Sequence, residues 1–232
     1  MMLLRRALLA LVLVVALPAA AREAPYLTVR DLDLATILPP PVEAGSMADV
    51  EQQGAVLAAQ WSATPERVEQ ARRDVDESPD TLFGAVLGKT LDPKVLPATT
   101  RLFARLRETE DAVVGPAKKA FKRVRPYLSD ARIKALVRPS VSGSYPSGHT
   151  TNATLGAIVM ADIVPEKRAA IWQRADDYSQ SRVIGGMHYP NDLLGGKLAG
   201  TAIAVALQSR PEFKADFAAA RRELRQYLGL AP

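Results

Sequence analysis

The sequence has 232 residues, 48% of them apolar, and a formal net charge of +5, to which Arg5 and Arg6 contribute two units. This length suits one domain with a core of its own. The lack of cysteine excludes a disulfide framework and a thiolate metal site. A mild positive charge with only 6% aromatic residues argues against a nucleic-acid-binding surface.

The first 21 residues have the pattern of a secretory signal peptide. Two arginines precede an apolar run over residues 7–17, and three alanines then suit cleavage. The run is too short to span a bilayer comfortably, although an uncleaved N-terminal anchor is the alternative. Asp162 and Lys197 interrupt the later apolar runs, so we expect a mature periplasmic protein without membrane spans.

Residues 22–46 read as an irregular proline-rich segment, and a helical domain is expected over 47–232. Within that domain, an alanine-rich stretch over 46–61 predicts a helix. Thr64 and Pro65 predict the cap and first turn of a second helix, which ends near Asp74.

A third helix is predicted to begin at Pro97, because apolar residues recur there at three- and four-residue intervals. Gly115 and Pro116 are expected to break it, and a basic helix over 117–125 to follow. A Ser/Gly-rich loop over 139–148 comes next.

The last third of the chain predicts four more helices. They cover about 150–163, from Pro165 to the glycine pair at 185–186, 190–207, and from Pro211 onward. No run of alternating polarity is long enough to predict a strand. We therefore expect an all-α, single helical domain of about eight or nine helices, without an internal repeat.

The chain has only two histidines, His149 and His188, and each lies in a Gly- and Pro-rich context at a predicted helix start. Helix N-termini bind anions and leave side chains accessible, which favours a catalytic role. Ser147 can cap the helix that follows His149, and Gly148 lets its N–H approach a phosphate oxygen. An ordinary capped helix is the alternative interpretation.

Two residues near His188 suit phosphoryl chemistry. Arg182 offers a planar fork for two phosphate oxygens. Asp192, four residues after His188, can accept the Nδ1–H of the imidazole, which leaves Nε2 with the free lone pair of a nucleophile. Alternatively, Asp192 is a first-turn residue that only favours the helix dipole.

Lys118 and Arg125 are seven residues apart, two turns along one face of the predicted basic helix, so both charges can point at one site. Lys119, Lys122 and Arg123 are expected to face solvent. An ordinary basic surface helix is the alternative. Taken together, the three segments supply cations, backbone donors and two imidazoles, a set that suits phosphoryl transfer.

In chain order the three segments read Lys-x6-Arg-Pro, Pro-Ser-Gly-His and Ser-Arg-x5-His-x3-Asp. This pattern resembles the class A bacterial non-specific acid phosphatases, within the phosphatidic-acid-phosphatase type 2 and vanadium haloperoxidase superfamily. Residues 143–150 match the signature of that class, and residues 37–46 are similar to its proline-rich N-terminal segment. The motifs span 118–192.

The resemblance implies an α-helical, metal-independent hydrolase that acts on small-molecule phosphate monoesters, needs no cofactor and can form homo-oligomers. His188 would attack phosphorus, Asp192 would orient it, and His149 would protonate the leaving alcohol and later activate water. The phosphate-binding residues that it implies are Lys118, Arg125, Ser147, Gly148 and Arg182.

Two other functions stay open. The same ligands could hold vanadate in a haloperoxidase, or phosphate in a non-catalytic binding protein, whereas the missing spans disfavour a membrane lipid phosphatase. For the phosphatase, attack needs a neutral His188 and a charged His149, which predicts a bell-shaped pH dependence with an acidic optimum.

Overall fold

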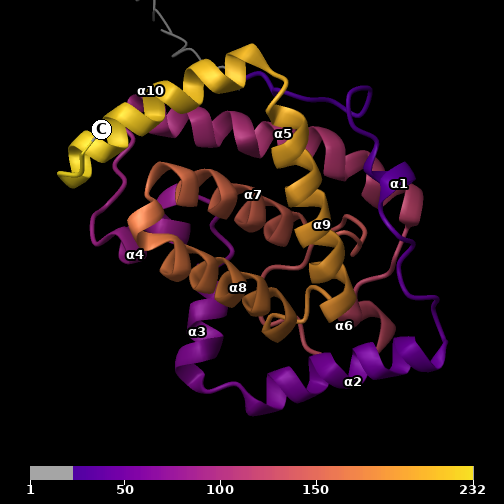
Figure 1. The fold of residues 1–232 in the computed structure, drawn as a ribbon. Coiled ribbons are helices and arrows are strands. Elements are labelled where there is room, and N and C mark those ends of the chain that lie inside the picture. The colour runs from indigo at the N-terminus through magenta and orange to yellow at the C-terminus, as the bar shows by residue number, and fades with distance from the viewer. Residues whose placement is uncertain (1–22, 232) are drawn as a thin grey trace, which may run out of the picture.

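The computed structural model describes residues 23–231, so the predicted signal peptide lies outside the described residues. Within that range the chain is helical and has no strand (Figure 1). The prediction of an all-α domain is confirmed. Among the described residues, none of the helices combines the length and the apolar character that crossing a bilayer requires.

Seven α-helices have nine or more residues in the described range, and three are shorter. In chain order they are α1 (Leu34–Ile37), α2 (Met47–Ser62), α3 (Pro65–Arg73), α4 (Ala85–Leu87), α5 (Pro97–Phe121), α6 (Pro126–Ser129), α7 (Gly148–Ile163), α8 (Arg168–Ile184), α9 (Pro190–Leu207) and α10 (Pro211–Leu228). A π-helical turn (Asp80–Gly84) leads into α4, and a 3-10 turn (Pro165–Lys167) precedes α8. Helix α1 is the regular part of the segment expected to be irregular.

Helix α7 lies at the centre of the fold, with α5, α8 and α9 around it, and α10 packs across α5 (Figure 1). Two glycines of α9 allow its close approach to α7. A Cβ on Gly196 would lie 2.7 Å from the carbonyl oxygen of Ser147, and a Cβ on Gly200 would lie 2.7 Å from that of Thr151. This close packing brings the first turns of α7 and α9, with their histidines, to the same end of the molecule.

The predicted break at Gly115 and Pro116 is wrong, because α5 runs through both residues. Proline disfavours the helical conformation of the residue before it, partly through a clash with that residue's Cβ. Glycine has no Cβ, so this part of the clash is absent here. Buried Val113, Val114 and Ala117 anchor the helix on both sides of the proline, and this packing offsets the lost hydrogen bond.

The predicted basic helix over 117–125 is also wrong. Helix α5 ends at Phe121, and Lys122 adopts the left-handed conformation with φ 54°. Arg125 is extended, with φ −76° and ψ 152°, and is the N-cap of α6. Its extended backbone follows from Pro126, since the residue before a proline avoids the helical region.

Candidate active site

Both histidines line one pocket of about 250 Å³ at the shared end of α7 and α9. His149 is in the first turn of α7, and His188 lies in the turn between α8 and α9. The pocket also contains the predicted phosphate-binding residues Lys118, Arg125, Gly148 and Arg182. The structure therefore brings together three stretches of chain that are far apart in sequence.

Ser147 connects the two helix starts from behind the pocket. Its side chain accepts a hydrogen bond from the N–H of Thr150, 3.3 Å away, so it caps α7 as predicted. Its own N–H donates to the carbonyl oxygen of Asp192 over 3.0 Å. That N–H is therefore already used, and the hydroxyl is the remaining donor of this fully buried residue, which does not itself line the pocket.

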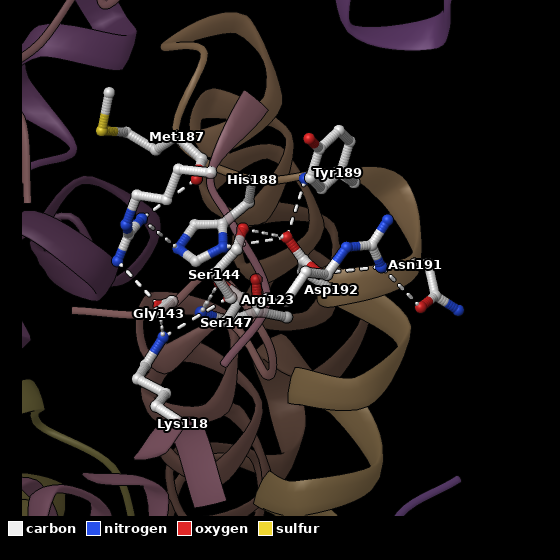
Figure 2. Close-up of polar contacts among 12 residues, drawn as sticks. Lys118, Arg123, Gly143, Ser144, Ser147, Met187, His188, Tyr189, Asn191 and Asp192 are labelled. Atoms are coloured by element: carbon white, nitrogen blue, oxygen red, sulfur yellow. Dashed lines mark hydrogen bonds and ion pairs between the residues drawn. The ribbon is translucent and has the colours of Figure 1, made fainter. Parts of the chain in front are cut away.

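The hydrogen-bond partners of His188 define its tautomer (Figure 2). Its Nε2 lies 3.2 Å from Nη1 of Arg125, and a guanidinium can only donate. Nε2 must therefore accept, and the ring proton sits on Nδ1, 3.4 Å from Oδ2 of Asp192. Burial and the charges of Arg125, Lys118 and Arg182 lower the pKa of His188 well below its usual value, which keeps the ring neutral.

Two hydrogen bonds and one ion pair hold the Asp192 carboxylate in place (Figure 2). The Ser144 hydroxyl donates to Oδ2 over 2.5 Å, and the Tyr189 N–H donates to the same oxygen over 2.9 Å. Nη1 of Arg123 lies 3.3 Å from Oδ1. Burial raises the pKa of Asp192, and Arg123, Ser144 and the Tyr189 N–H oppose that rise.

The expectation that Arg123 faces solvent is wrong. Its guanidinium is buried, stacks 4.2 Å from the ring centroid of Tyr189, and lies 3.6 Å from Asp49 of α2. In an extended segment, residues two apart face the same way, so Arg123 and Arg125 both turn inward. The sequence signal for this arrangement was the proline that follows Arg125.

Lys118 and Arg125 do converge, but not along one helix face as predicted. Lys118 is in α5, whereas Arg125 reaches back from the extended segment after it. Both side chains donate to the carbonyl oxygen of Gly143, over 2.9 Å and 3.2 Å respectively. Lys119 and Lys122 are exposed, as expected.

Arg182 adds free donors to the pocket. The residue is 4% exposed, and neither its Nε nor its Nη1 has a hydrogen-bond partner among the described residues. A buried guanidinium with unused N–H groups costs free energy unless an anion binds to it. Together with Lys118 and Arg125, it gives this wall of the pocket three cationic side chains.

His149 has a different environment from His188. Its Nε2 lies 3.3 Å from the carbonyl oxygen of Val75, and its Nδ1 lies 3.4 Å from Oε1 of Glu77. The ring stacks on Tyr178, with 5.9 Å between centroids. Burial and the charges of Arg182, His188 and Arg107 lower the pKa of His149 well below its usual value, and the hydrogen bond to the Val75 carbonyl opposes only part of this.

An acidic side of the pocket was not predicted. Glu77, Glu110 and Asp111 line it with Arg107, whose guanidinium lies 2.8 Å from Glu77 and 2.6 Å from Glu110. No local motif marks these carboxylates, because long-range packing alone places them here. Among residues 23–231, no group of three or more His, Cys, Asp or Glu could hold a metal ion.

Comparison with known proteins identifies the family. Residues 109–214 match the model of the PAP2 superfamily. The non-specific acid phosphatase of Providencia stuartii is 30% identical to the chain over 200 residues, which cover 83% of this chain and 81% of that protein. The chain belongs to the non-specific acid phosphatases of the PAP2 superfamily.

Two solved structures of more distantly related sequence are similar to this acid phosphatase chain in fold. A transmembrane PAP2-type phosphatidylglycerolphosphate phosphatase from Bacillus subtilis matches with a TM-score of 0.54 and 20% identity, over 75% of this chain and 89% of that one. A bacterial vanadium-dependent iodoperoxidase matches with a TM-score of 0.51 and 16% identity, over 73% and 52%. At these identities the likeness concerns the fold alone.

Proposed function

We propose that this non-specific acid phosphatase hydrolyses small-molecule phosphate monoesters of varied structure through a phosphohistidine on His188. The observation that carries the proposal is the position of Nε2. It lies in the pocket with its lone pair free of a proton, and the unpartnered donors of Arg182 line the same pocket. A neutral imidazole among cations can attack a phosphorus atom whose oxygens those cations hold.

In the first step, Nε2 of His188 forms a bond to phosphorus as the bond to the ester oxygen breaks. Asp192 stabilises the ring charge that develops, through the Nδ1 contact. His149 gives its Nε2 proton to the departing oxygen, so that an alcohol leaves. In the second step, His149 takes a proton from water, which attacks phosphorus and releases His188.

Phosphate would be held by the unpartnered donors of Arg182 and by the positive charges of Lys118 and Arg125, together with groups at the first turn of α7. The Gly148 N–H belongs to the first turn of that helix, where N–H groups have no intrahelical partner. Because its own N–H is used, Ser147 would contribute its hydroxyl. These donors supply the charge stabilisation that a metal ion gives elsewhere, so we propose metal-independent hydrolysis.

We also propose that the chain is exported to the periplasm by its first 21 residues. Their charged, apolar and alanine regions support this. N-terminal sequencing of the protein from a periplasmic extract should find a new terminus shortly after the alanines at 19–21. An intact Met1 terminus would contradict export by cleavage.

The test of the mechanism is to trap the phosphoenzyme. Quenching a reaction with a labelled aryl phosphate should give acid-labile, base-stable phosphate on a peptide that contains His188, and His188→Ala should abolish both label and turnover. Activity should survive EDTA. Base-labile label, or loss of activity on chelation, would overturn the proposal.

A vanadate-dependent haloperoxidase is the second candidate, because the fold also matches an iodoperoxidase and the same cations could bind vanadate. Vanadate should inhibit a phosphatase as a phosphate mimic, and it should activate a peroxidase. Halide oxidation that depends on added vanadate would favour the second candidate.

A further inference from the structure

The pocket contains a second carboxylate–imidazole pair, formed by Glu77 and His149. The proposed mechanism uses the imidazole of this pair but gives the carboxylate no role. Oε1 of Glu77 lies 3.4 Å from Nδ1 of His149. This oxygen is buried and has no hydrogen-bond partner among the described residues. A buried carboxylate oxygen is costly without compensation, so its ion-pair contact with the imidazole is significant.

Glu77 and His149 are both held rigidly. Oε2 of Glu77 lies 2.8 Å from the Arg107 guanidinium of α5, so the carboxylate is fixed from its other oxygen. Tyr178 of α8 stacks on His149 at an interplanar angle of 18°, and its hydroxyl donates to the carbonyl oxygen of Asp76 over 3.1 Å. The same tyrosine therefore contacts both the imidazole ring and the backbone of the residue that precedes Glu77.

The two histidines face opposite kinds of partner. Both nitrogens of His149 face acceptors, the Val75 carbonyl and the Glu77 carboxylate. An imidazolium, which donates from both nitrogens, satisfies both acceptors. His188 instead presents Nε2 to Arg125, which can only donate. The partners alone therefore favour a protonated His149 and a neutral His188.

Other groups act on the pair as well. The charged and titratable groups around it are Asp76, Arg107, Glu110, Asp111, Lys118, Tyr178, Arg182 and His188. Burial raises the pKa of Glu77, and Arg107 opposes that rise. Burial and the nearby cations lower the pKa of His149.

We infer that Glu77 is a positioning residue for His149. The Glu77 carboxylate accepts a hydrogen bond from the Nδ1–H of His149 and thereby turns the Nε2–H toward the leaving oxygen. The inference rests on the proposed function, since it takes His149 as the proton donor. The Nε2 proton passes to the ester oxygen as the P–O bond breaks and the bond between His188 and phosphorus forms. The other ring proton stays on Nδ1, hydrogen-bonded to Glu77. The neutral ring later accepts a proton from water at Nε2.

The test compares two leaving groups in Glu77→Gln. p-Nitrophenol leaves as a stable anion and needs little protonation, whereas glycerol must be protonated as it leaves. We expect kcat/KM for glycerol phosphate to fall about 10- to 100-fold, which is less than the roughly 10²- to 10⁴-fold that a general acid itself contributes, because Glu77→Gln leaves the imidazole of His149 in place. The value for p-nitrophenyl phosphate should change little, and so should the inhibition constant of inorganic phosphate. The alkaline limb of the kcat profile should move to lower pH.

Three other variants make the result decisive. Asp111→Asn removes a more exposed carboxylate that lies 3.6 Å from Arg107 and, unlike Glu77, forms no ion pair with His149 among the described residues, and it should discriminate between the two esters much less than Glu77→Gln does. Glu77→Asp keeps the charge and should recover part of the glycerol phosphate activity. His149→Ala should discriminate as Glu77→Gln does.

Two outcomes would overturn different claims. If His149→Ala discriminates but Glu77→Gln affects both esters equally, or neither, Glu77 does not position the proton donor and the proposed function stands. If His149→Ala does not discriminate either, the proton-donor role in the proposed function itself is wrong.

Discussion

Arg123 lies 3.3 Å from Oδ1 of Asp192, whereas His188 contacts the other oxygen of the same carboxylate. The Arg123 side chain is 6% exposed and that of Asp192 is fully buried. Asp192 thus has one oxygen for the imidazole and one for a permanent cation. This arrangement opposes the rise that burial causes in the pKa of Asp192, and so favours the ionised carboxylate beside His188.

Arg123→Met should therefore lower both the stability of the protein and its kcat. Removing one partner of a buried ion pair leaves the other uncompensated, which costs about 3–5 kcal/mol. Urea unfolding should measure this loss. The pKa of Asp192 should rise, so kcat should fall most at acidic pH, where the carboxyl group becomes protonated. Arg123→Lys keeps the charge, so its stability and kcat should lie between those of the wild type and of Arg123→Met. If the pH profile of kcat is unchanged in Arg123→Met, Arg123 does not have this role.

Local signals in the sequence predicted most of the fold. Thr64 caps α3, and the prolines at 190 and 211 begin α9 and α10 as expected. The break at Pro116 was wrong because packing on both sides of α5 outweighs the lost hydrogen bond. A local pattern cannot report such packing.

The candidate site was predictable to the extent that each residue belongs to a motif. His149 and His188 carry their own context of glycine, proline and helix start. Glu77 has no such context, because it faces His149 only after α7 and α8 have packed. Arg123 was assigned to solvent because the helix around it was predicted to continue. Convergence across the pocket is therefore a property of the fold rather than of any segment.

Gly200→Val should destabilise the protein through the contact between α7 and α9. The new Cβ would lie 2.7 Å from the carbonyl oxygen of Thr151, which is backbone and can move only if α7 moves. Overpacking of this kind costs about 1–3 kcal/mol. Gly54→Ala is the control: nothing lies within 4 Å of a Cβ there, and its helix propensity should make it slightly stabilising. Equal midpoints in urea for the two variants would contradict close packing at Gly200.

The affinity of the pocket for phosphate should fall as pH rises through about 8. Burial lowers the pKa of Lys118 to about 8, and burial raises the pKa of Glu110 to about 8. Below this pH the lysine is charged and the carboxyl group neutral. Above it the lysine loses its positive charge and the glutamate gains a negative one, so both changes oppose anion binding.

Competition against an aryl phosphate at a series of pH values measures this effect. Glu110→Gln should bind phosphate as tightly as the wild type at neutral pH and lose less affinity on the alkaline side. A pH dependence that is the same in both proteins would exclude Glu110 as one of the titrating groups.

Arg182→Lys should test whether the fork of the guanidinium, rather than its charge, holds the phosphate. Nε and Nη1 of Arg182 are both buried without hydrogen-bond partners among the described residues, so two nitrogens of the guanidinium have unused N–H donors. Lysine keeps the charge but cannot donate in parallel, and a hydrogen bond to a charged group contributes about 1.5–3 kcal/mol. The inhibition constant of inorganic phosphate should therefore rise by roughly 10- to 150-fold, with the tautomer of His188 and the contact of Glu77 with His149 left intact. Lys119→Arg, an exposed change on the outer face of α5, is the matched control and should leave the inhibition constant as it is. If Arg182→Lys binds phosphate as the wild type does, the free donors of Arg182 serve packing and not the anion.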